Sequence, residues 1–82
     1  MSNLVYATGR PYGAPLAMLR GGATRDPEVK AAIKAHGFMW DGARHAWRTY
    51  MYDDEFAAVL ADLADRFPEV AIRPKDGQEA LP

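Results

Sequence analysis

The sequence predicts an α+β fold, a two-layer sandwich in which an antiparallel sheet of four or five strands carries two helices on one face. Three observations predict it. Two stretches place apolar residues at helical spacing, an Asp-Gly dipeptide lies between alternating aromatic flanks, and 82 residues suit one small domain. The expected order is ββαββα with a possible final strand. Two amphipathic helices need a common apolar surface, and a sheet supplies it.

The first two elements are expected to be strands. Residues 3–8 alternate weakly and contain Leu4, Val5 and Tyr6, a composition typical of a strand. Glycines and prolines between residues 9 and 15 then indicate a turn. Residues 16–20 form a short apolar run whose periodicity does not distinguish a strand from a helical turn. We favour a strand that pairs with the first.

The first helix is well marked at both ends. Asp26 is a favourable N-cap, and Pro27 suits the first helical position because its missing N–H has no partner there. Gly37 can adopt the left-handed conformation that ends a helix. The apolar face of this helix is expected to contain Val29, Ala32, Ile33 and His36, with Lys30 and Lys34 on the other face.

Asp41-Gly42 predicts a hairpin. A turn of two or four residues places Trp40 opposite Ala43 or His45, and both turns sort the side chains in the same way. One face is then expected to carry Phe38, Trp40, His45, Trp47, Thr49 and Met51. The other face is expected to carry Met39, Asp41, Arg44, Ala46, Arg48, Tyr50 and Tyr52.

The second helix is expected to start at Asp53 and to end before Pro68. Its apolar stripe consists of Phe56, Val59, Leu60, Leu63 and Phe67. Residues 69–73 are a candidate last strand with Val70 and Ile72 pointing inward. We therefore expect one domain over residues 1–73 and a flexible C-terminal tail over residues 74–82.

The net charge of −1 hides an asymmetry along the chain. Residues 1–52 contain seven Lys or Arg against three Asp or Glu, a balance of +4. Residues 53–82 contain three against eight, a balance of −5. This pattern suggests two surfaces with different partners, although an acidic solvated face on the second helix explains it equally well.

Composition excludes several classes of function. The chain has no cysteine, which excludes disulfides, Cys-based zinc sites and thiol catalysis. It has no apolar run of membrane-spanning length and no recognisable signal peptide, so we expect a cytoplasmic protein. Two histidines without ligand spacing give little support for a metal, and no Ser/His/Asp set can be built. We expect no cofactor and no enzyme activity.

The candidate binding residues combine basic and aromatic side chains. Arginine can hold phosphate while tyrosine offers a surface for base stacking, which is what binding of single-stranded nucleic acid requires. The same residue types are also enriched at protein–protein interfaces and in strands generally. The expected set is Arg44, Arg48, Tyr50 and Tyr52 on the hairpin, with Tyr6, Arg20, Lys30 and Lys34 from other elements. We expect Trp40 and Trp47 to belong mainly to the core, and an exposed one would favour stacking.

Residues 16–47 resemble a known type of module. The pattern is a strand, a turn of Gly-x-Thr type, a Lys-rich helix ending in glycine, and an aromatic-x-Trp-Asp-Gly segment followed by a second tryptophan. It resembles small modules of unknown function in bacterial, phage and plasmid proteins, and is more distantly similar to the HARP domain of annealing helicases. The resemblance implies a nucleic-acid context and mainly structural roles for Gly37, Trp40, Asp41, Gly42 and Trp47.

Two functional hypotheses follow. The first is a non-catalytic accessory protein that binds single-stranded or fork DNA through a basic and aromatic sheet face. The alternative is a phage or mobile-element inhibitor that binds a host protein complex such as a CRISPR effector, its acidic surface occupying a nucleic-acid groove. A homodimer is compatible with both hypotheses.

Overall fold

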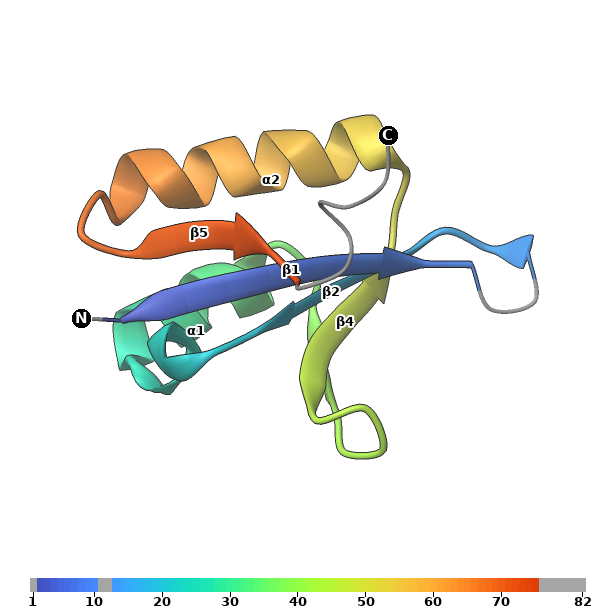
Figure 1. The fold of residues 1–82 in the computed structure, drawn as a ribbon, viewed down its shortest axis with the longest axis horizontal. Helices are drawn as coiled ribbons and strands as arrows, with labels where there is room; N and C mark the ends of the chain where they lie inside the picture. Colours follow the sequence, from blue (N-terminus) through green and yellow to red (C-terminus); the bar gives the residue numbers. More distant parts are fainter. Residues whose placement is uncertain (1, 11–12, 76–82) are drawn as a thin grey trace.

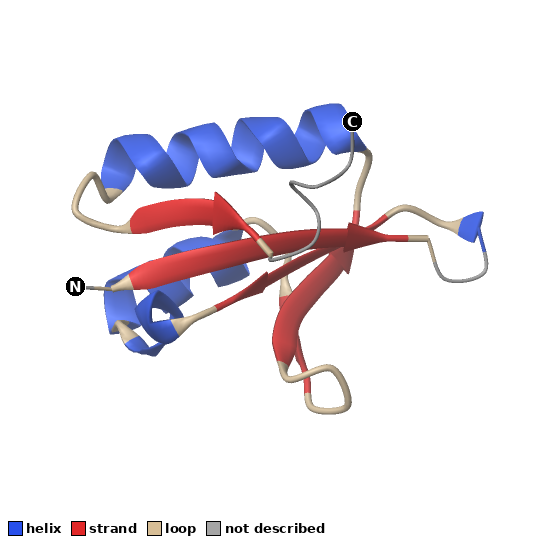
Figure 2. Ribbon diagram, in the orientation of Figure 1, coloured by secondary structure: helices blue, strands red, loops and turns tan. Residues whose placement is uncertain are grey.

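A computed structural model describes residues 2–10 and 13–75 of the chain. It confirms the predicted α+β fold with two helices on one face of a sheet (Figures 1 and 2). The elements in chain order are β1 (Asn3–Gly9), β2 (Leu16–Arg20), the 3-10 helix η2 (Gly22–Arg25), α1 (Pro27–Ala35), β3 (Met39–Asp41), β4 (Ala46–Tyr50), α2 (Asp53–Arg66) and β5 (Ala71–Pro74).

The sheet is mixed, which corrects the expectation of a purely antiparallel one. Its strand order is β3-β4-β2-β1-β5, and β5 pairs in parallel with β1 while the other pairs are antiparallel. The single helix α2 returns the chain to the end of the sheet at which β4 began, so β5 must run in the direction of β4. Since β1 also runs in that direction, its pairing with β5 is parallel.

The C-terminal boundary lies slightly beyond the expected one. Pro74 is the last residue of β5, and the Lys75 amide donates a hydrogen bond of 2.9 Å to the Tyr6 carbonyl. Residues 76–82, most of the expected tail, lie outside the described residues.

The core lies between the sheet and the two helices. Leu4 of β1 and Leu19 of β2 are almost completely buried against Val29 and Ile33 of α1 and Leu63 of α2. Aromatic rings extend this cluster, because Phe56 of α2 packs edge-on against Tyr6 at 6.0 Å and also contacts Phe38 at 6.2 Å.

Both helices begin as their sequences predict. The Asp26 carboxylate accepts a hydrogen bond from the Glu28 amide at 2.9 Å, and the Tyr52 amide donates to the Glu55 carboxylate at 3.1 Å. His36, at the end of α1, contacts Asp62 of α2 at 2.8 Å and so joins the two helices. No helix in the described part of the chain is long and apolar enough to span a bilayer.

The hairpin register differs in detail from the expected one. Trp40 lies opposite Trp47, and residues 42–45 form a four-residue connection between Asp41 and Ala46. The Asp41 carboxylate accepts hydrogen bonds from the amides of Ala43 and Arg44, which keeps Asp41 in the strand and moves the turn forward. Compared with the expected four-residue turn, the partner of Trp40 changes from His45 to Trp47, a shift of two residues. Because an even shift leaves the side-chain alternation unchanged, the strand residues keep the faces that the sequence predicted for them.

The turn after β2 depends on Gly21. Its φ of 122° and ψ of 172° lie in a region that only glycine adopts readily. A Cβ at this position would approach the Asn3 carbonyl oxygen to 2.6 Å, and the backbone of β1 cannot move aside easily. The backbone at Gly21 therefore passes close to the backbone of β1 at Asn3 as the chain turns from β2 into η2.

We predict that Gly21→Ala lowers the free energy of unfolding by at least about 2 kcal/mol, because backbone strain and a steric clash act together. Gly22→Ala is the matched control, since its Cβ would meet only the Asn3 side chain at 4.0 Å and its φ is not positive. Urea denaturation of both variants measures the difference. Equal stability of the two variants would contradict this account of the turn.

Candidate nucleic-acid interface

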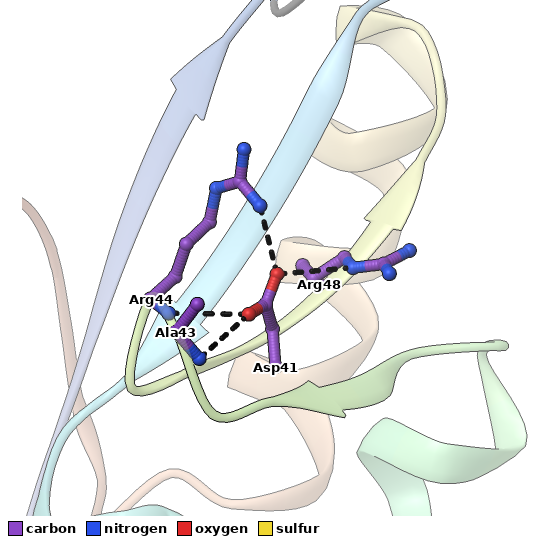
Figure 3. A network of polar contacts seen from close by, with 4 residues as sticks. All are labelled: Asp41, Ala43, Arg44 and Arg48. Atoms are coloured by element: carbon purple, nitrogen blue, oxygen red, sulfur yellow. Dashed lines mark hydrogen bonds and ion pairs between the residues drawn. The ribbon is translucent and has the colours of Figure 1, made fainter.

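The two hairpin arginines of the predicted site are held by one carboxylate (Figure 3). Arg44 Nη1 donates to Asp41 Oδ2 at 2.8 Å, and Arg48 Nε donates to the same oxygen at 3.3 Å. The other oxygen, Oδ1, accepts the amides of Ala43 and Arg44. The Asp41 side chain keeps only 10% of its surface exposed in this network. The positive charge of this face is therefore partly neutralised from within the hairpin.

The same network shifts the acidity of Asp41. Hydrogen bonds from the Arg44 guanidinium and amide, with a smaller contribution from Arg48, lower the pKa of the Asp41 carboxyl below its ordinary value of 3.8. Desolvation opposes this shift and does not overcome it. Asp41 is therefore held as a carboxylate that orders the turn.

The predicted tyrosines lie in three different environments. Tyr50 is 52% exposed, with the Arg48 guanidinium 5.8 Å from its ring centroid, and shares the face opposite the helices. Tyr52 is 65% exposed and precedes α2. Tyr6 points to the helix-covered face and packs on Phe56, so it does not join Arg48 and Tyr50 on the open face. Its side chain lies on the same face of β1 as that of Leu4, which is buried in the core.

Trp40 is the exposed tryptophan. It is 55% exposed, while its neighbour Trp47 is partly buried against the core. The two indoles meet edge to face at 5.7 Å between centroids, which holds Trp40 in one orientation. The expectation that both tryptophans belong mainly to the core is therefore wrong for Trp40. Trp40 lies on β3, which is an edge strand of the sheet, and its side chain remains largely in solvent.

A hollow lies beside Trp40 and is lined by the end of β2, the residues of η2 and the β3–β4 turn. Figure 1 shows this turn projecting from the sheet. Its volume of about 580 Å³ is within the range of ligand sites. Its lining combines three cationic or titratable side chains with an aromatic ring and backbone. These residues are Asn3, Val5, Arg20, Gly21, Gly22, Thr24, Arg25, Trp40 and His45.

A second hollow, of about 290 Å³, adjoins the first. Thr24, Arg25 and Trp40 line both, and the second adds Lys30 and Trp47. The structure therefore brings the predicted Arg20 and Lys30 to a common region around Trp40.

The predicted Lys34 lies close to this region. Its ammonium nitrogen lies 5.6 Å from the centroid of the Trp47 ring, a cation–π contact. The region consequently includes a further cation behind the tryptophan pair.

These hollows carry unneutralised positive charge. No Asp or Glu is among the described residues that line either one. Within the described ranges, Arg20, Arg25 and Lys30 make no ion pair with a carboxylate. Arg44 and Arg48, by contrast, both contact the Asp41 carboxylate.

Sequence reasoning missed Arg25 and His45 as site residues. Arg25 directly precedes the N-cap of α1, and such a position projects from the end of a helix beside the sheet. That signal was available in the sequence. His45 lines the hollow because it adopts a left-handed backbone, with φ of 52°, and only the observed turn shows this.

The residues that line the two hollows provide groups suited to binding. In the described part of the chain, no three His, Asp or Glu side chains gather where a metal ion could be held. The other histidine, His36, contacts Asp62 at 2.8 Å. The groups that converge on the hollows are cations and indole rings, which bind phosphate and bases respectively.

We predict that Asp41→Asn destabilises the protein at neutral pH and that its deficit relative to the original chain shrinks in acid. A lowered folded pKa means that the carboxylate stabilises the fold above pH 3.8 and that this contribution is lost as pH falls below it. Urea denaturation across this range measures the deficit. Asp65→Asn is the control, because none of the ion pairs found within the described residues involves Asp65. A deficit for Asp41→Asn that is independent of pH would refute the assignment.

Comparison of the chain with protein-family models, with curated proteins and with solved structures gave no match.

Proposed function

We propose that this chain is a non-catalytic protein that binds single-stranded nucleic acid at the two hollows around Trp40. The observation that carries the proposal is an indole that is 55% exposed and flanked by three cations with no carboxylate in the lining. An exposed ring gives a stacking surface that any base can use, and free guanidinium and ammonium groups attract the phosphates. The resemblance to modules of DNA-processing proteins agrees with this proposal.

Single strands fit the site better than a duplex. A base can stack on Trp40 only when its own face is free, and duplex bases are already stacked and paired. The ring also lies inside a recess lined by Arg20 and Arg25 rather than on a long flat surface. The partner is therefore expected to be a single strand, including one at a DNA fork.

The surface around Arg48 and Tyr50 on the sheet fits this function less well. It offers Tyr50 and Arg48, but Arg48 shares a carboxylate with Arg44. A phosphate approaching this face would meet the negative charge of Asp41 as well as the arginines. We therefore move the proposed interface from the predicted face to the neighbourhood of Trp40.

One observation favours a second candidate, a protein that inhibits a host complex by occupying its nucleic-acid groove. Helix α2 contains five acidic residues and one basic residue, so it presents a negative surface. Nucleic-acid binding and capture of a protein partner separate the two candidates. A chain that binds no oligonucleotide but retains a partner, with weaker retention for Asp54→Asn and Asp65→Asn, supports inhibition.

We predict that Trp40→Ala weakens binding of a fluorescent thymidine oligonucleotide at least about fivefold, the effect of one lost base stack. Tyr50→Ala is the matched control, since Tyr50 is 52% exposed but lies on the other face, and it should change the Kd by less than about twofold. Fluorescence anisotropy at low salt gives both constants.

The salt dependence of the same assay tests the cations. With three phosphate contacts, the logarithm of the association constant should fall against the logarithm of salt with a slope of about −2. Arg25→Ala should reduce the slope by about 0.7, whereas Arg73→Ala, which removes an exposed arginine on β5, should not. Absence of binding at tens of micromolar, or equal effects of Trp40→Ala and Tyr50→Ala, would overturn the proposal.

A further inference from the structure

We infer that the two hollows hold two consecutive nucleotides of one strand, with Trp40 between their bases and Arg25 at the phosphate that joins them. This inference rests on the proposed function and adds the size and direction of the bound unit. It starts from the fact that Thr24, Arg25 and Trp40 line both hollows, while the remaining residues line only one. The shared residues therefore form the boundary between two compartments.

Each compartment has its own cationic and polar groups. The larger adds Arg20, His45 and the Asn3 side chain to the boundary, and the smaller adds Lys30 and the half-buried Trp47. A phosphate on either outer side would therefore meet a separate cation. Arg25, exposed at the end of η2, is the cation that both compartments share. A phosphate that links two nucleotides across the boundary would be expected to contact it.

Trp40 is suited to separate two bases. Apolar side chains that insert between base steps unstack them, and a single strand resists this less than a duplex does. The indole is held at its inner side by Trp47 at 5.7 Å, so it keeps its position without a ligand. Gly42 lies near the ring, since an added Cβ at this position would be 3.8 Å from Trp40 Nε1.

The backbone between the strands fixes the spacing of the compartments. Gly21 contacts β1 closely, the Gly22 amide donates to Asn3 Oδ1 at 3.3 Å, and the Thr24 hydroxyl donates to the Gly21 carbonyl at 2.7 Å. Arg25 follows directly on this braced turn. The backbone of the boundary is therefore ordered in the absence of ligand. This order favours binding because less conformational entropy is lost when the ligand binds.

The test is a length series of unlabelled 5′-phosphorylated thymidine oligomers, from the mononucleotide to the octanucleotide, that displace a bound fluorescent oligonucleotide. The largest single gain in affinity should occur between the mononucleotide and the dinucleotide, at least about fivefold, because the second base gains a stack and the linking phosphate gains Arg25. Uridine oligomers form a parallel series that distinguishes RNA from DNA.

Substitutions test whether the gain in affinity from one to two nucleotides arises from the boundary residues Arg25 and Trp40. Arg25→Ala should remove most of the gain between one and two nucleotides, whereas Arg73→Ala should leave it intact. Trp40→Phe should retain part of the gain and Trp40→Ala should abolish it. Circular dichroism and thermal unfolding show that each variant is folded.

The outcomes separate this inference from the proposed function. If long oligonucleotides bind but affinity rises evenly with length, the two-nucleotide unit is wrong and the proposed function stands. If Arg20→Ala alone removes binding while Arg25→Ala and Lys30→Ala do not, a single compartment is used and the inference fails. If no oligonucleotide binds, both fail.

Discussion

The register of the β3–β4 hairpin is the constraint on which the proposed site depends. Trp40 faces Trp47 because the pairing is fixed by the Asp41 turn, in which one carboxylate accepts two amides and two guanidinium contacts. A slip of β3 by one residue would move Trp40 to the face opposite the helices, while Trp47 would stay in place because β4 pairs with β2. The neighbourhood of Arg25 and Lys30 would then lack its exposed indole.

Charge is divided between two parts of this small fold. The acidic residues of α2 lie in the helix layer, where Asp62 joins His36 and Arg66. The cations near Trp40 come from the end of β2, from η2 and from α1. Figure 1 shows α2 and the β3–β4 turn on opposite sides of the molecule. A negative ligand would be repelled by one region and attracted by the other, which would orient it during approach.

Much of the fold followed from local signals in the sequence. Asp26, Pro27 and Gly37 marked the ends of α1, and the parity of the hairpin sorted its strand residues onto the correct faces. The parallel pairing of β5 did not follow, because it depends on which edge of the sheet the chain reaches after α2. The exact turn did not follow either, since it depends on the carboxylate geometry of Asp41.

The site was harder to predict than the fold. Sequence parity placed Arg48 and Tyr50 correctly on one face, but it could not show that Asp41 would engage both Arg44 and Arg48. The exposure of Trp40 depends on the place of β3 at the edge of the sheet, and the gathering of Arg20 with Lys30 depends on the turn at Gly21. These are tertiary properties that arise from elements distant in the sequence.

The most direct test of the proposed interface is a titration of ¹⁵N-labelled protein with a short single-stranded oligonucleotide, followed by NMR. The account predicts that the indole N–H signal of Trp40 and the amide signals of residues 20–25 shift together, while the amides of Arg48 and Tyr50 change little. Shifts concentrated at Arg48 and Tyr50, or no shifts at all, would contradict it.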